Sequence, residues 1–153
     1  MSTTTNLGIE LINGSDYISP DPINNGFTTL DKLGVDYIVE DGTSGEWWYR
    51  KWNSGRAECG IDNKNFGDID HKNQWGGMYT SSQMTWGNYP FSFKSRPFVS
   101  ISFNGTSTGG HCSFVAYQSN DSTDTPPKFA IADPNSGTAT GARFSILVSG
   151  WYK

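Results

Sequence analysis

Four titratable residues lie close together in residues 61–77, IDNKNFGDIDHKNQWGG: Asp62, Asp68, Asp70 and His71. Paired carboxylates can act as acid and base in glycoside hydrolysis, but that chemistry depends on the separation of the carboxyl groups, which spacing along a polar segment does not set. The sequence has no nucleophile elbow, no phosphate loop and no HExxH pattern. We therefore expect no enzymatic activity and assign no catalytic residue.

Metal-ligating residues are few. The two histidines, His71 and His111, belong to no cluster with ligand spacing, so a structural role is the simpler interpretation of each. Asp68, Asp70 and Asn73 match part of an oxygen-rich calcium loop without completing it. The sequence therefore predicts no metal site and no cofactor.

Carbohydrate binding requires less of a sequence, namely an exposed aromatic ring and nearby amides or carboxylates. The candidate rings and their polar neighbours are Trp75, Tyr79, Trp86 and Tyr117, with Asp70, Asn73 and Gln74. The alternative for each aromatic is a place in the core or at a subunit interface. We predict that recognition lies on residues 61–77, expected to be a long loop anchored by Phe66, Ile69 and Trp75, and on the segment that begins at Met78.

Composition indicates which elements must position these residues. The chain has 153 residues, 14% aromatics and 18 glycines, without the runs of Ala, Leu, Glu and Lys that helical domains show. A net charge of −4 provides no basic field, so nucleic acid is not an expected partner. No apolar run approaches the roughly 20 residues that span a bilayer, and we expect no membrane insertion.

Short segments with β-strand character recur at the spacing of an antiparallel sandwich. They are residues 78–86, 89–93, 98–103, 111–117, 128–132 and 142–151. Val99, Ile101 and Phe103 alternate with serines, and turn residues such as Asn104-Gly105 separate the segments. We predict a mainly β fold, in which residues 42–153 form a jelly-roll-like antiparallel β-sandwich.

A hairpin is predicted between residues 47–52 and 56–60, with its turn at Asn53-Ser54-Gly55. A three-residue loop would place Arg50 opposite Glu58, whereas a two-residue loop would pair Lys51 with Glu58. Either register brings opposite charges together, so charge alone does not choose. The three-residue loop is favoured because it collects Trp47, Tyr49, Ala57 and Cys59 on one apolar face.

Residues 1–41 are predicted to form a neck with one short helix at about residues 23–33. Its apolar stripe comprises Ile23, Phe27, Leu30 and Leu33, and Gly34 follows where a helix normally ends. Three helical turns with a single stripe are marginal alone. The helix therefore packs against its own head or around a threefold axis, and we favour the axis as a trimer interface.

One stretch resembles a known class of proteins. Residues 36–45 (DYIVEDGTSG), followed by Trp47, residues 49–52 (YRKW), Gly55 and residues 57–59 (AEC), are similar to a segment of tail-fibre and baseplate proteins from phages and prophages of Gram-positive bacteria. The resemblance implies the C-terminal neck and head of a receptor-binding protein: a homotrimer at the tip of the virion tail, made in the host cytoplasm, joined to upstream tail or baseplate proteins, and adsorbing to a cell-surface polysaccharide.

Two other function classes remain open. A free lectin or carbohydrate-binding module would differ from a tail fibre in its oligomeric state, and a glycan depolymerase would cut a substrate. The two cysteines, Cys59 and Cys112, are predicted to be free thiols, because a protein made in a bacterial cytoplasm keeps its thiols reduced.

Overall fold

The structure, a computed structural model, describes residues 2–3, 10–11, 36–107, 114–118 and 122–153. The chain divides into two compact units, Met1–Tyr37 and Ile38–Lys153. In the first unit, β1 (Ser2–Thr3) pairs antiparallel with β2 (Glu10–Leu11). The helix predicted at residues 23–33, with its stripe Ile23, Phe27, Leu30 and Leu33, lies outside the described residues.

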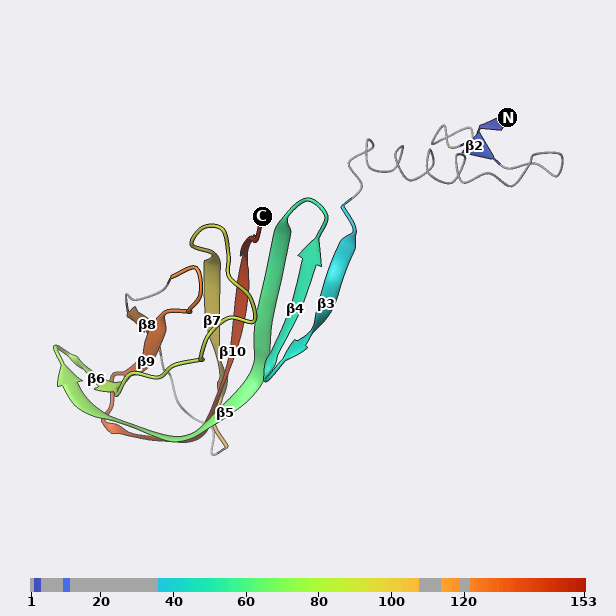
Figure 1. Cartoon of the computed structure of the whole chain (residues 1–153). Coiled ribbons are helices and arrows are strands. Elements are labelled where there is room, and N and C mark those ends of the chain that lie inside the picture. The colour runs from blue at the N-terminus through green and yellow to red at the C-terminus, as the bar shows by residue number, and fades with distance from the viewer. Residues whose placement is uncertain (1, 4–9, 12–35, 108–113, 119–121) are drawn as a thin grey trace. The chain divides into compact units, whose positions relative to one another are not determined.

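The second unit contains an eight-stranded sheet (Figure 1). Its strands are β3 (Ile38–Ser44), β4 (Trp47–Trp52), β5 (Arg56–Trp75), β6 (Met78–Ser81), β7 (Phe98–Gly105), β8 (Phe114–Gln118), β9 (Lys128–Asp133) and β10 (Gly137–Trp151). All the strand pairs among the described residues are antiparallel. The predicted mainly β, antiparallel fold is confirmed. The jelly-roll-like sandwich is not confirmed, because the hydrogen bonds connect these strands into one sheet.

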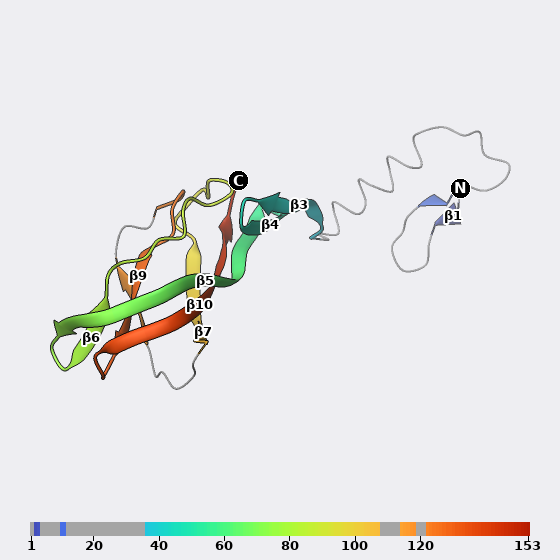
Figure 2. The same cartoon turned by 90° about the horizontal axis from the view of Figure 1, so that it is seen from below.

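Two long strands form the centre of this sheet. β5 and β10 run side by side from the pair Trp151 and Arg56 to the pair Gly137 and His71 (Figure 2). The other edge of β5 pairs with β4 near its start and with β6 near its end, while β7 pairs with β10. The sheet therefore has two arms that share β5 and β10. One arm contains β3, β4 and β7, and the other contains β6, β9 and β8. Register shifts in the β5–β10 ladder interrupt its regular pleat, as β-bulges do where a sheet bends.

The prediction that residues 61–77 form a loop was wrong, because most of this segment belongs to β5. Ile61, Ile69 and His71 are buried and point inward. Between them the chain has positive φ at Asn63 and at Gly67, next to the register shifts. These irregularities break the two-residue alternation that identifies a strand in a sequence.

The predicted β4–β5 hairpin is confirmed. Arg50 pairs with Glu58 across the ladder, and their side chains approach to 3.8 Å. Gly55, at φ +97°, closes the three-residue turn and donates its N–H to the Trp52 carbonyl. Trp47, Ala57 and Cys59 are buried, with Tyr49 partly buried beside them. The apolar face therefore selected the register, as expected.

Aromatic rings form much of the core. Phe129 and Phe144 are fully buried, and their ring centroids are 5.1 Å apart. Phe66 meets both rings edge-on, so this predicted anchor is part of the core. In the arm that contains β4, the ring centroids of Trp47 and Tyr89 are 5.7 Å apart. The two arms contribute to a single hydrophobic cluster.

The strand predicted at residues 78–86 is present only as β6, which ends at Ser81, and the strand predicted at residues 89–93 is absent, so the chain continues from β6 as an irregular segment. Tyr89 and Phe93 are buried there, and both donate backbone N–H groups to the carbonyls of Asp124 and Thr123. Pro90 has no N–H to donate, which helps to prevent a regular ladder. This segment covers the core with side chains and not with a paired strand.

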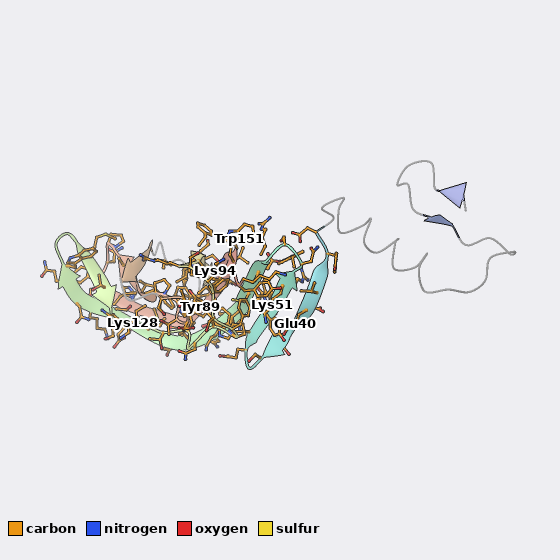
Figure 3. All side chains as sticks on the ribbon, turned by 45° about the horizontal axis from the view of Figure 1, so that its top comes forward. Glu40, Lys51, Tyr89, Lys94, Lys128 and Trp151 are labelled. Carbon is orange, nitrogen blue, oxygen red and sulfur yellow. The ribbon has the colours of Figure 1, made fainter. Side chains whose placement is uncertain are left out.

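A partly buried ammonium group helps to hold the edge strand β3. Lys51 Nζ lies 2.8 Å from a carboxylate oxygen of Glu40 and 4.9 Å from the ring centroid of Phe91 (Figure 3). The hydrogen bond from Lys51 holds the pKa of Glu40 below its ordinary value. β3 is thereby tied to β4 by side chains as well as by the ladder. Within the described residues, no helix is long and apolar enough to cross a membrane.

Candidate functional site

Most of the predicted glycan-binding residues meet at the end of the β5–β6 hairpin. A two-residue turn, Gly76-Gly77, places Trp75 opposite Met78 and Gln74 opposite Tyr79. Since facing residues share one side of a sheet and side chains alternate, Trp75 and Met78 lie on one side and Gln74 and Tyr79 on the other. Trp75 is 65% exposed. We call Asn73, Gln74, Trp75, Met78 and Tyr79 the hairpin tip.

Trp75 was predicted both as an anchor for its segment and as a ligand-stacking ring. Its exposure is incompatible with the first role and leaves its ring accessible for the second. Asn73, next on the same side of β5, pairs with Thr80, whose hydroxyl donates to the Asn73 carbonyl at 3.4 Å. The tip therefore presents an aromatic ring with an amide beside it.

The base of the hairpin is held firmly. Tyr79 and Thr80 pair with Asp133 and Ala132 of β9. The hydroxyl of Ser81 accepts the Ile131 N–H at 3.1 Å and donates to the Ser82 carbonyl at 2.9 Å. The exposed residues of the tip thus project from a paired and buried platform.

Asp70 lies on β5 before the tip, and its carboxylate already has partners. The Thr138 hydroxyl donates to it, and Lys72 Nζ lies 3.0 Å away. These two hydrogen bonds, the Thr138 bond first, hold the pKa of Asp70 below its ordinary value. Asp70 therefore links β5 to β10, and a ligand would have to compete with Thr138 and Lys72 for it.

The titratable residues of residues 61–77 do not form a joint site. The Asp68 carboxylate accepts the Gly141 N–H at 2.9 Å. His71 is buried, with Nδ1 3.4 Å from the Ile69 carbonyl oxygen. In the part of the chain that the structure describes, no group of three or more His, Cys, Asp or Glu side chains could hold a metal ion.

Two predicted binding residues lie apart from the hairpin tip. Trp86 is only 4% exposed, and its ring stacks on Phe129 at 5.2 Å and 19°. It therefore belongs to the core and offers no open ring face, which corrects the prediction that it is an exposed platform. Tyr117 pairs with Phe129 through the β8–β9 ladder, and its side chain lies outside the described part of the chain.

The sequence did not indicate a hollow of about 290 Å³ beside Trp86. It is lined by Thr85, Trp86, Gly87, Asn88, Thr125, Pro126 and Lys128. The sequence signals near it are two sets of turn residues, Trp86-Gly87-Asn88 and Thr125-Pro126-Pro127. Between this hollow and the hairpin tip runs β9, whose five residue steps correspond to roughly 16 Å.

A second exposed apolar surface lies on the arm that contains β4 and β7, on the side of the sheet that faces away from the core. Leu147 pairs with Gly60 on β5, and Gly60 in turn pairs with Trp48 on β4. Phe98 pairs with Ser149, which alternation places on the same side as Leu147 and Trp151. We call Trp48, Phe98, Leu147 and Trp151 the outer face; the last three are exposed.

Comparison with known proteins gives one informative likeness. No protein-family model and no curated protein sequence matches the chain. Among solved structures, an N-truncated R1-type pyocin tail fiber is similar, with a TM-score of 0.50 and 14% sequence identity. The likeness covers 91% of this chain and 100% of that one. At this identity the comparison shows that the two chains share a fold.

Proposed function

We propose that this protein is a tail fibre of a phage or phage-like particle, and that its β-rich unit adsorbs to a glycan on a bacterial surface. The observation that carries the proposal is the likeness in fold to the pyocin tail fiber, which extends over that whole chain. The tail-fibre-like segment at residues 36–59 supports the same role from the sequence. The protein is non-catalytic in this proposal and forms part of the virion tail.

The hairpin tip is the proposed contact with the glycan. Sugar rings present C–H groups that pack on an aromatic face and hydroxyls that bond to amides. Trp75 supplies the exposed ring, and Asn73 supplies an amide on the same side of the strand. Gly76 and Gly77 have open space around them, so a polymer can approach the ring without meeting the turn.

Assembly as a homotrimer completes the proposal. One stacked ring with a few hydrogen bonds gives affinity on the order of millimolar to high micromolar. Three linked sites gain roughly 10²–10⁴ in apparent affinity on a cell surface. The exposed side chains of the outer face offer an apolar surface for a neighbouring copy, in addition to the stripe Ile23, Phe27, Leu30 and Leu33. Upstream tail or baseplate proteins are the further expected partners.

Adsorption to host cells tests the binding site. Trp75→Ala should reduce binding of the full chain to its host cells at least tenfold, because the stacking ring is lost, while the thermal unfolding midpoint stays unchanged. Trp75→Tyr should retain most binding because it keeps a ring. Met78→Ala is the matched control, since it removes an apolar side chain of the same tip but no ring.

The possible failures are separable. Normal adsorption by a folded Trp75→Ala protein would place the site elsewhere, and unfolding of that variant would show that Trp75 is structural. Light scattering should give a mass near three chains of 16.8 kDa each. A monomeric protein that still binds glycan would favour a free lectin, and cleavage of the polysaccharide would favour a depolymerase.

A further inference from the structure

The hollow beside Trp86 is created by the backbone. Met84 and Phe129 exchange two hydrogen bonds, of 2.7 and 3.1 Å, and Tyr89 donates its N–H to the Asp124 carbonyl at 2.9 Å. Between these ties, residues 85–88 run opposite residues 125–128. Pro126 and Pro127 have no N–H to donate, so the ladder cannot continue there and the two segments separate.

Two parts of the wall are held by packing and by a hydrogen bond. Trp86 is packed against Phe129 on one side and meets the ring of Phe66 at 5.0 Å and 85°. A turn held by the Ser122 hydroxyl, which accepts the Thr125 N–H at 3.0 Å, positions Thr125. These two parts of the wall are therefore in place without a ligand, as is usual for small-molecule sites.

The lining groups suit a hydroxylated, negatively charged molecule. Thr85, Asn88 and Thr125 contribute hydroxyl and amide groups, which can both donate and accept hydrogen bonds. The lining includes one cation, Lys128, and no carboxylate. Lys128 is exposed and has no ion pair among the described residues; it lies at the far end of the sheet from the Glu40–Lys51 pair (Figure 3).

Trp86 adds an independent observation. Its indole N–H is buried and has no hydrogen-bond acceptor in the described structure, although its residue lines the hollow. An unpaired buried donor costs about 1–3 kcal/mol, and that cost is normally removed by water or a ligand. This nitrogen is inaccessible from the hollow as the side chains stand, so it is an unsatisfied group in the wall and is not counted among the ligand contacts.

We propose that this hollow binds a single sugar unit bearing a phosphate or carboxylate group. The inference rests on the proposed function and narrows it: the host glycan would be anionic, with Lys128 contacting its charge and Thr85, Asn88 and Thr125 its hydroxyls. A volume of about 290 Å³ suits one ring, since it lies at the lower end of the roughly 300–1,000 Å³ seen for ligand pockets.

Calorimetric titration of the full chain tests the site with four probes: glucose 6-phosphate, glucuronic acid, glucose and inorganic phosphate. We expect one or both anionic sugars to bind with a Kd on the order of millimolar, and glucose and phosphate to bind at least tenfold more weakly. Comparison of the two anionic sugars identifies the preferred charge. Equal binding of inorganic phosphate would indicate a simple ion site and overturn the proposal.

Variants locate the binding. Lys128→Gln should weaken the anionic sugar about tenfold and leave glucose unchanged, because only the charge-assisted contact is lost. Asn88→Ala should weaken all the sugars. Both side chains are exposed, so the variants should fold, and Lys94→Gln, which removes an exposed charge outside the lining, should bind the probes as the parent does. Unchanged affinity in Lys128→Gln would refute the site.

Cell adsorption separates this inference from the proposed function. If the parent and Lys128→Gln adsorb equally to host cells and none of the sugars binds, the hollow is not a sugar site and the tail-fibre role stands. If the sugars bind in the hollow but the protein adsorbs to no bacterial cell, the site stands and the tail-fibre role falls.

Discussion

The substitution Gly60→Ala tests whether β4, β5 and β10 pack together as described. A Cβ atom at Gly60 would lie 2.6 Å from the Ile146 carbonyl oxygen and 2.7 Å from Cζ2 of Trp48. The carbonyl belongs to β10, which is paired on both edges, so it cannot move away easily. Gly60 is therefore required by close approach, and no positive φ is involved.

The expected cost follows from these two contacts. Forcing an extra methyl group into a packed site costs typically about 1–3 kcal/mol. Alanine recovers roughly 0.4–1 kcal/mol because it restricts the unfolded chain. A net loss of about 1–2 kcal/mol in the free energy of unfolding should result. For a domain of this size, that lowers the melting temperature by roughly 3–8 °C.

Chemical and thermal unfolding at one fixed protein concentration provide the assay, since association would make the midpoint depend on concentration. Gly77→Ala is the control, because nothing lies within 4 Å of a Cβ built there. It should change the unfolding free energy by less than about 0.5 kcal/mol. A Gly60→Ala protein as stable as this control would refute the proposed packing of Trp48 on β5.

Three other predictions concern stability and reactivity. Burial raises the pKa of the Cys59 thiol to about 12, so Cys59 in the folded protein should not react with a thiol reagent at pH 8, whereas denatured, unreduced protein should titrate two thiols, Cys59 and Cys112. Because this pKa lies above the ordinary 9.0, the thiol's contribution to stability is complete below about pH 9 and is lost as pH rises towards 12 in denaturation curves. Phe129→Ala should cost roughly 3–5 kcal/mol in urea unfolding, since the ring is fully buried among other rings. Since Lys51 lowers the pKa of Glu40, the contribution of the Glu40 carboxylate to folding stability is present above pH 4.5 and is lost as the pH falls below it. Lys51→Met should make this acid loss of stability smaller when melting temperatures are measured against pH.

Local chemistry was sufficient for part of the fold. The β4–β5 hairpin was predictable because its turn, its charge pair and its apolar face all agree on one register. The strands near residues 98–103, 128–132 and 142–151 were likewise visible, since Val99, Ile101 and Phe103 alternate with serines in the manner of a half-buried strand. These features depend on neighbours in the chain.

Other elements depended on distant partners. β5 continues through residues 61–75 because β10 pairs with it, although Asn63 and Gly67 interrupt the alternation that a strand shows in sequence. Residues 89–93 look like a strand but lack a continuous partner, and their Tyr89 and Phe93 instead fill the core. Hydrogen-bond pairing between remote segments decided both cases.

The candidate site shows the same division. The sequence by itself determined that tryptophans, amides and carboxylates gather near residues 70–86, and it predicted Trp75 and Trp86 as equivalent platforms. Only the tertiary structure separated them. Trp75 stands at the end of the β5–β6 hairpin, where the described residues leave it largely exposed, whereas Trp86 meets Phe129, a residue far along the chain, and is buried. The physical reason is that burial depends on which surfaces pack together, and a residue's own type and local spacing do not contain that information.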